Sequence, residues 1–300
     1  MKQRRLEQEA ECAKPLKQEP DLKQDHRQAT ERKAIIYLSS DEEDAIPTKK
    51  VVLRKKLFDF QIVSFRRGET RWKSSVDEDD AARLKPNTWL NNTLLTYYIH
   101  KNIPQQETTY NFDCFLSAQL ESNSLVADPF HPTVKAKTCE ALCRTVSGFD
   151  WGTYRYVQIP ICMGFHWSFL LVDNPMAIDG TTRFYHVDSI AGYHDTAKIC
   201  ALMLQFFAQE KMEKTGQPHS MQHEVKQVHT DPQQSNGYDC GIYVMYYMKQ
   251  INQAIKDEGG ITLERMQALC TGLNQRGCDR FRREYLSELI SEDSMITIEI

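Results

Sequence analysis

The sequence lacks long apolar runs and an excess of positive charge. No stretch approaches the about 18 consecutive apolar residues of a membrane-spanning helix, and residues 1–11 are polar and charged, unlike a signal peptide. The formal net charge is -4, so no strongly basic face for nucleic acid is indicated. We therefore expect a protein that acts without nucleic acid and without a membrane.

Cysteine pairs at the C-x-x-C spacing of zinc ribbons are also missing. The nine cysteines are scattered and none forms a C-x-x-C pair, which argues against a zinc ribbon. No disulfide framework is expected in a chain of 300 residues without a secretion signal. His219, His223 and His229 lie in a polar stretch without a cysteine partner, so we interpret them as solvated. We expect no metal, no cofactor, and reduced thiols of which one is free to act as a nucleophile.

The chain divides by composition near residue 50. Residues 1–50 alternate charged and amide side chains with few large apolar ones, so this region is predicted to be disordered. Residues 51–300 are predicted to form one domain. Within 51–83 a short hairpin and an edge strand stay open as alternatives, around Val51–Leu53 and Phe60–Val63.

The predicted elements run in the order helices, strands, helices, which favours an α+β fold over a doubly wound parallel sheet. A first helix follows the turn at 84–89, with Asn87 or Thr88 as its cap. Further helices are predicted at 139–146, 197–211 and 240–255, and two more within 263–290, separated near Gly277. Strands are predicted at 154–161, 166–172, 183–187 and, at an edge, 225–228. The strand at 166–172 is apolar enough to be buried on both faces.

Cys240 is the best candidate for a nucleophile. A thiol attacks a carbonyl as the thiolate, which a helix N-terminus or a positive neighbour stabilises. Asp239 is placed to cap the apolar helix that follows, so the positive end of the helix dipole would point at the sulfur. The alternative is a buried, inert cysteine, because free cysteines are commonly buried.

Two further polar residues lie at the tips of neighbouring predicted strands. His166 opens one strand and Asp188 ends the next, so an imidazole and a carboxylate can come within hydrogen-bond reach and act as base and orienting acid. Gln234, six residues before Cys240, offers an amide for an oxyanion hole together with the backbone N–H of Cys240. Each of these residues, taken alone, has a structural alternative at a strand end or in a solvated loop.

The segments Gly164–Trp167, Val187–Ser189 and Pro232–Gly241 together resemble the motifs of the sentrin-specific (ubiquitin-like-protein-specific) protease family. Trp89–Asn92 is similar to that family's Trp-Leu-Asn-Asp motif, and the order His, Asp, Cys agrees as well. The resemblance covers roughly 84–290.

The resemblance implies a papain-like cysteine protease fold, with a central mixed sheet flanked by helices. It implies that Cys240 is the nucleophile, His166 the general base and then acid, Asp188 the orienting carboxylate and Gln234 the oxyanion donor. Its substrates would be SUMO and SUMO conjugates, cut after the C-terminal Gly-Gly both in the precursor and at lysine linkages. Trp89 and Trp167 would roof a tunnel that admits only a tail without side chains.

One departure concerns the choice of modifier. Asn92 stands where the family usually has an aspartate that is expected to pair with an arginine of the modifier. The alternative substrate is the neddylation modifier, because the deneddylase branch has a similar stretch around Tyr238. Paralogue preference and physiological targets stay open.

An apolar island, Ile35, Ile36, Tyr37 and Leu38, interrupts the N-terminal region and is followed by acidic residues up to Asp44. The segment 35–44 resembles a SUMO-interaction motif, which adds as a strand to the edge of the SUMO sheet. Ser39 and Ser40 precede acidic residues, so phosphorylation would add charge to this contact. The alternative is a chance apolar cluster in a disordered tail.

Two other function classes compete with a SUMO protease. The chain could be an inactive SUMO-binding scaffold, which the intact set of His166, Asp188, Gln234 and Cys240 argues against. It could also be an acyltransferase, although no basic cluster near these residues would hold coenzyme A. We expect a monomer, and the family and the island imply a nuclear location with a cytoplasmic share as the alternative.

Overall fold

A computed structural model describes residues 55–64, 70–114, 116, 146–176, 180–216 and 222–296. By internal contacts the chain divides into residues 1–53 and 54–300, and the described residues all belong to the second unit. The predicted disordered region 1–50, its island at 35–44 and Val51–Leu53 therefore lie outside the described residues, as does most of the helix predicted at 139–146.

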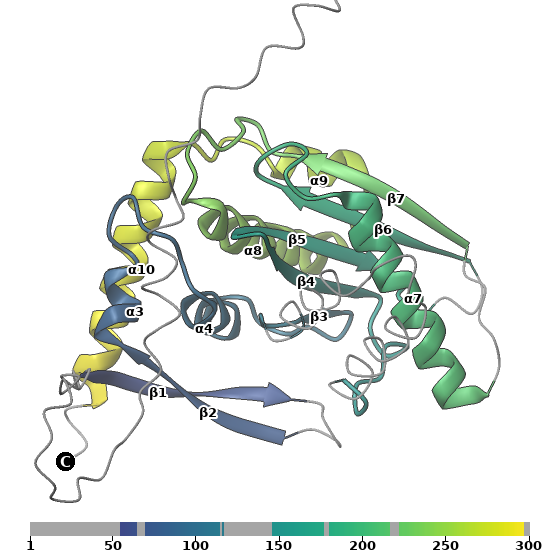
Figure 1. Cartoon of the computed structure of the whole chain (residues 1–300), viewed down its shortest axis with the longest axis horizontal. Helices are drawn as coiled ribbons and strands as arrows, with labels where there is room; N and C mark the ends of the chain where they lie inside the picture. The colour runs from purple at the N-terminus through teal and green to yellow at the C-terminus, as the bar shows by residue number, and fades with distance from the viewer. Residues whose placement is uncertain are drawn as a thin grey trace, which may run out of the picture. The chain divides into compact units, whose positions relative to one another are not determined.

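A five-stranded mixed sheet in the order β3-β4-β5-β6-β7 forms the centre of the described unit (Figure 1). Its strands are β3 (Thr109–Asn111), β4 (Tyr156–Met163), β5 (His166–Asp173), β6 (Thr181–Asp188) and β7 (Gln222–His229). The outer pairs β3–β4 and β6–β7 are parallel, and the inner pairs β4–β5 and β5–β6 are antiparallel. The α+β fold with a mixed sheet is confirmed, and the predicted edge strand is β7.

The middle strand β5 is buried along its whole length, as its apolar run predicts. Phe169 and Leu171 face one core, which also contains residues of α4 (Asn92–Asn102) and α8 (Cys240–Glu258). Leu170 and Val172 face the other, beneath α7 (Thr196–Thr215). Alternate side chains of a strand point to opposite faces, so helices cover the sheet on both sides (Figure 1).

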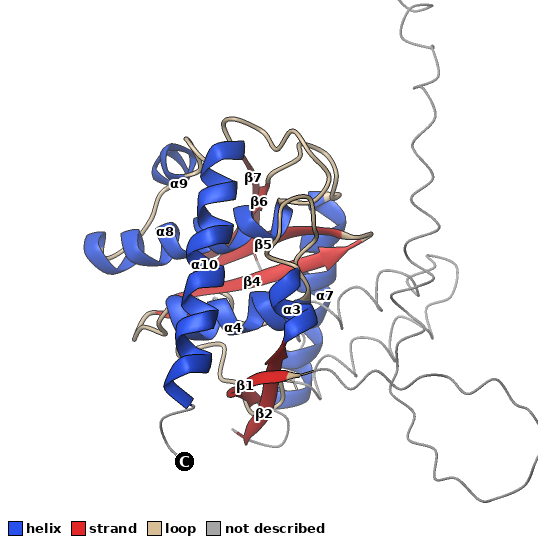
Figure 2. Cartoon of the chain, turned by 90° about the vertical axis from the view of Figure 1, so that its left-hand side faces the viewer, coloured by secondary structure: helices blue, strands red, loops and turns tan. Residues whose placement is uncertain are grey.

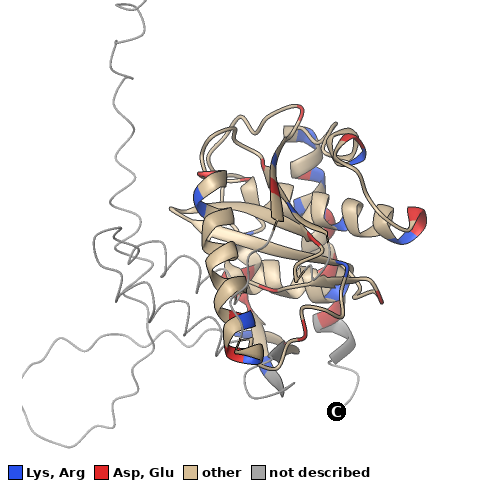
Figure 3. Cartoon of the chain, turned by 90° about the vertical axis from the view of Figure 1, so that its right-hand side faces the viewer, with Lys and Arg blue, Asp and Glu red and all other residues tan. Residues whose placement is uncertain are grey.

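The remaining elements pack around these layers (Figure 2). They are the antiparallel hairpin β1 (Lys56–Ser64) and β2 (Thr70–Asp77), the short helix α3 (Glu78–Ala82), α9 (Leu263–Leu269) and α10 (Gln275–Ile296). The hairpin is thus the alternative that the structure adopts within the segment 51–83. Most charged positions lie on helices and loops (Figure 3), and none of the described helices is long and apolar enough to span a bilayer.

The first predicted helix begins later than expected. Its cap is Asn91, whose side chain accepts a hydrogen bond from the backbone N–H of Leu94, and not Asn87 or Thr88. Asn87 has a left-handed backbone with φ 60, and the Thr88 hydroxyl donates to the carbonyls of Arg83 and Lys85. The helix cap therefore lies four residues after Asn87 and three after Thr88.

The two predicted helices are present, but the break expected near Gly277 lies earlier in the chain. The chain breaks at 270–274, between α9 and α10, and Gly277 lies inside α10. A Cβ at Gly277 would come within 2.9 Å of the side chain of Leu273. Gly277 therefore packs closely against Leu273 and forms no turn.

Candidate active site

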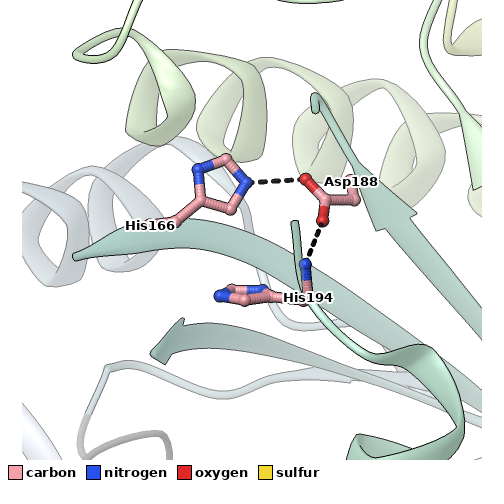
Figure 4. A group of neighbouring side chains, drawn as sticks. All are labelled: His166, Asp188 and His194. Carbon is pink, nitrogen blue, oxygen red and sulfur yellow. Dashed lines mark hydrogen bonds and ion pairs between the residues drawn. The ribbon is translucent and has the colours of Figure 1, made fainter. Parts of the chain in front are cut away.

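Three residues far apart in sequence meet where the central strands end. His166 is the first residue of β5, Asp188 the last of β6, and Cys240 the first of α8. The Nε2 atom of His166 lies 2.6 Å from Oδ1 of Asp188 (Figure 4), and the ring also shares a hydrogen bond with the Cys240 thiol. All three side chains are buried. With Nε2 occupied by Asp188, Nδ1 is the nitrogen left for the thiol.

Opposing effects set the charge of the imidazole and the carboxylate. Burial lowers the pKa of His166, but its hydrogen bonds with Asp188 and Cys240 outweigh burial and raise the pKa to about 9. Burial raises the pKa of Asp188, but the bond from His166 and the backbone N–H groups of Ile190 and His194 hold it below its usual value. Those N–H groups lie 3.0 and 3.2 Å from the carboxylate oxygens. The pair is therefore imidazolium and carboxylate at neutral pH.

The predicted cap of α8 is wrong in its chemistry. Asp239 occupies the N-cap position, but its side chain makes no capping hydrogen bond. Its carboxylate pairs with Arg282 of α10 instead, with Oδ1 receiving bonds of 2.9 and 2.6 Å from the guanidinium. The N-terminal N–H groups of α8, beside the sulfur of Cys240, are therefore not neutralised by the carboxylate that precedes them.

Arg282 also ties the segment before α4 to this helix start. Its guanidinium donates to the carbonyl oxygens of Arg83, Lys85, Thr88 and Tyr238, and its side chain is 2% exposed. We did not predict this residue from the sequence. A signal was present, because Arg282 stands at helical spacing within the buried set Cys278, Tyr285 and Leu289, where an apolar side chain is expected.

Gln234 is held inside the loop that precedes Cys240. Its Oε1 accepts from the Ser189 hydroxyl at 2.7 Å, and its amide nitrogen donates to the Asn236 carbonyl at 2.5 Å. The side chain of Asn236 in turn accepts from the backbone N–H groups of Tyr238 and Asp239. These contacts place Gln234 next to the residue that follows Asp188. Its role as an oxyanion donor stays a prediction.

Trp89 and Trp167 differ in their surroundings, and their expected role as the roof of a tunnel stays a prediction. Trp167 is 5% exposed, and its indole N–H donates to the Leu90 carbonyl at 3.3 Å. Trp89 is half-buried and its ring centroid lies 5.9 Å from that of Phe165. Phe165 is 58% exposed, so it presents more aromatic surface beside His166 than Trp167 does.

Phe165 and Tyr193 are residues of the site that sequence reasoning missed. Phe165 has φ 64, a left-handed backbone that is uncommon for a bulky residue. The Tyr193 ring lies 4.3 Å from the His166 ring between centroids, and its hydroxyl donates to the Gly164 carbonyl at 2.7 Å. Nothing in the local sequence around Tyr193 indicates that its loop folds back over β5.

Asn92 is exposed at the first position of α4. A side chain at this place is accessible to a partner, as the comparison with the family's aspartate requires. Its role in binding a modifier stays a prediction.

Three potential metal ligands, His166, Asp188 and His194, have ligand atoms within 4.8 Å of one another. The chemistry of this set favours hydrogen bonds over a metal. The ring nitrogens of His194 are engaged by Ser168 at 2.7 Å and by the Met163 carbonyl at 2.9 Å. A cation would need a lone pair that these two bonds already use.

A protein-family model described as "Ulp1 protease family, C-terminal catalytic domain" matches residues 123–288. Three curated relatives illustrate the similarity. "Probable ubiquitin-like-specific protease 2A" of Arabidopsis thaliana is 24% identical over 58% of this chain and 24% of its own length. "Sentrin-specific protease 2" of Homo sapiens is 22% identical over 61% and 29%, and "Probable sentrin-specific protease 8" of Dictyostelium discoideum is 26% identical over 62% and 74%. The chain thus spans about a quarter of the length of the first two relatives.

Solved structures share the fold. A structure described as a "de-sumoylating protease" superposes with a TM-score of 0.57 at 16% identity, over 79% of this chain and 92% of that one. The C-terminal Ulp1 protease domain in complex with Smt3, the yeast ortholog of SUMO, superposes with a TM-score of 0.50 at 18% identity, over 81% and 90%.

Proposed function

Because the chain belongs to the Ulp1 protease family of cysteine proteases, we propose that it cleaves after the C-terminal Gly-Gly of SUMO, in precursors and at lysine linkages. The observation that carries this proposal is the buried contact of His166 with both Asp188 and Cys240. An imidazole whose pKa is about 9 is protonated at neutral pH. His166 can therefore accept and hold the proton that leaves the Cys240 thiol.

The proposed reaction follows from this charge distribution. The Cys240 thiolate attacks the carbonyl carbon of the last glycine, and the carbonyl oxygen becomes an oxyanion. The N–H groups at the start of α8 and the amide of Gln234 would stabilise that charge. His166 then gives its proton to the leaving amine, which in a conjugate is the ε-amine of a lysine, and a thioester remains.

The second half of the reaction regenerates the thiolate. A water molecule gives a proton to His166 and attacks the thioester carbonyl, and the C–S bond breaks. The products are the modifier with a carboxylic acid terminus, which loses its proton to water, and Cys240 with His166 in their starting charge states. Asp188 stays ionised throughout and fixes the ring so that Nδ1 faces the reacting atoms.

SUMO is proposed as the modifier for two reasons. The island at 35–38 with its acidic tail resembles a SUMO-interaction motif, and a human relative is named a sentrin-specific protease. The aromatic rings of Trp89 and Phe165 lie 5.9 Å apart between centroids, and we expect them to line a narrow passage for the tail of either modifier. A glycine tail would pass such a passage, whereas a Cβ would add volume at each residue.

The neddylation modifier is the second candidate. Asn92 is exposed at the start of α4 and is uncharged, so it offers no carboxylate to an arginine of SUMO. The stretch that ends at Cys240 contains Tyr238, as in the deneddylase branch of the family. Both features concern the choice of partner and leave the chemistry unchanged.

The full chain should be assayed side by side on fluorogenic substrates built on SUMO and on the neddylation modifier. We expect faster turnover of the SUMO substrate, and loss of precursor and lysine-linked cleavage in Cys240→Ser with an unchanged circular dichroism spectrum. Faster turnover of the other substrate would overturn the choice of modifier. Failure of Cys240 to react with C-terminal vinyl sulfones of both modifiers would overturn the protease assignment in favour of an inactive binding scaffold.

A nuclear location is a further proposal, which depends on the family and on the N-terminal island. Microscopy of the tagged full chain in cells would test it, and exclusion from the nucleus would contradict it.

A further inference from the structure

Behind the His166–Asp188 pair lies a continuous chain of buried hydrogen bonds. The His194 ring contacts the Met163 carbonyl at 2.9 Å and the Ser168 hydroxyl at 2.7 Å. That hydroxyl also contacts Nε2 of His186 at 2.8 Å, and Nδ1 of His186 contacts the Thr196 hydroxyl at 2.7 Å. These hydrogen bonds thus connect four elements: the end of β4, the strands β5 and β6, and the start of α7.

The direction of every hydrogen bond in this series follows from the bond between His194 and the Met163 carbonyl. A backbone carbonyl can only accept, so Nε2 of His194 donates to Met163 and Nδ1 accepts from Ser168. The Ser168 oxygen then accepts from Nε2 of His186, whose Nδ1 accepts from Thr196. All these bonds are satisfied with both histidines neutral.

Burial and the charge of His166 favour this neutral state and outweigh the Asp188 carboxylate, which raises the pKa of both rings. The groups that face them are His166 and Asp188 at the strand ends, the Tyr193 ring, and the hydroxyls of Ser168 and Thr196. Burial lowers the pKa of His186 to about 4, and burial also lowers the pKa of His194. A charged His194 would lie 4.9 Å from the His166 ring between centroids and would repel the imidazolium.

The series of hydrogen bonds is linked to Asp188 through the backbone of His194. His194 is fixed by its ring, and its backbone N–H donates to Oδ2 of Asp188 at 3.2 Å (Figure 4). The backbone N–H of Ile190, in the same loop, donates to Oδ1 at 3.0 Å. The loop 189–194 therefore meets Asp188 at both of its ends.

We propose that Ser168, His186 and His194 form a positioning network that holds this loop against Asp188 and so aligns the carboxylate with His166. The inference builds on the proposed protease function, and assigns roles to three residues that touch neither the nucleophile nor the scissile bond. An anchor of neutral groups suits this place, because it stabilises the carboxylate without a cation that would compete with His166.

Ser168→Ala tests the network, because it removes the hydroxyl that joins the two rings. The matched control is Thr182→Val, which removes another buried hydroxyl, bonded to the Asn174 carbonyl at 2.7 Å, from the far end of β6. The readouts are kcat and KM on the SUMO substrate, thermal unfolding, and the titration of the His166 ring by NMR in the absence of substrate.

For Ser168→Ala we expect kcat to fall roughly ten- to a hundredfold with KM unchanged, and the His166 titration to move from about 9 towards 6.5. Thr182→Val should lose thermal stability without either change. A Ser168→Ala protein that loses only thermal stability, with kcat and the His166 titration of the wild type, would overturn the proposal.

A second pair of variants covers the case in which Ser168→Ala does not fold. His194→Gln keeps a donor for the Met163 carbonyl, whereas His194→Leu keeps neither ring bond. We expect the His166 titration to shift further in His194→Leu than in His194→Gln, and equal shifts would contradict the network. The NMR titration needs no modifier, so a failure of SUMO cleavage leaves this test intact.

Discussion

Two buried aspartates, one beside each reacting group, are held by different means. Asp239, beside the nucleophile, is neutralised by the guanidinium of Arg282, which is itself fixed by four backbone carbonyls. Asp188, beside the base, receives two backbone N–H groups from a loop that neutral histidines anchor. Among the described residues, Asp188 forms its ion pair with His166.

The difference follows from what each carboxylate must do. Asp239 precedes a helix start that has to stay positive, so a permanent cation removes the effect of its charge on the sulfur. Asp188 has to favour a proton on His166, and a permanent cation beside it would lower the pKa of that ring. Charged anchoring on one side and neutral anchoring on the other therefore serve the same pair of reacting groups, Cys240 and His166.

The largest effect is expected from Arg282→Met. The substitution leaves Asp239 buried without its cation, and breaking a buried ion pair in this way costs about 3–5 kcal/mol. Urea unfolding should show a loss of this size together with loss of turnover. Arg283→Met, at the exposed neighbouring position, should stay within about 0.5 kcal/mol. Equal losses in the two variants would show that Asp239 does not depend on its cation.

Asp188→Asn should mainly affect catalysis. An amide in place of the carboxylate no longer favours the imidazolium or fixes the ring, so kcat should fall by about 10³- to 10⁴-fold. The pH above which kcat declines should move down from about 9 as the pKa of His166 returns towards 6.5. The measurement is a pH profile of kcat on the SUMO substrate. An unchanged alkaline limb would separate Asp188 from the ionisation of His166.

Stability should fall on both sides of neutral pH, for opposite reasons. The pKa of His166 is about 9 in the folded state, above its ordinary value of 6.5. Its contribution to the free energy of unfolding is therefore complete below pH 6.5 and is lost as the pH rises from 6.5 to about 9. The pKa of His186 is about 4 when folded, so unfolding takes up a proton and stability falls from pH 6.5 towards 4.

Urea unfolding at several pH values measures this comparison. His166→Gln should flatten only the alkaline side of the stability profile, and His186→Gln only the acid side. If His186→Gln changed the alkaline side instead, the assignment of the neutral histidine would be wrong.

The smallest effect on stability is expected from Phe165→Asn. Asparagine tolerates the left-handed backbone at this position, and the ring is mostly exposed, so the free energy of unfolding should change by about 0.5 kcal/mol or less. KM for the SUMO substrate should rise about threefold or more if the ring contacts the tail. Met212→Gln, which removes another exposed apolar side chain, on α7, should leave KM unchanged. An unchanged KM in Phe165→Asn would place the ring outside the passage.

Elements with a strong local pattern were predicted well. The strand at 166–172 and the helices at 197–211 and 240–255 match β5, α7 and α8 closely, because apolar periodicity is a local property. The strand β3 has three residues, too few for a pattern. The start of α4 was misplaced because the hydroxyl of Thr88 bonds backward to carbonyls and does not cap forward.

The sequence by itself determined the family, the order of His166, Asp188 and Cys240, and the positions of each at the end of an element, because motifs and periodicity can be read along the chain. Only the tertiary structure decided that Asp239 binds Arg282, that Tyr193 covers His166, and that His194 and His186 are neutral. These properties depend on which groups face one another after folding, and on how completely water is excluded between them.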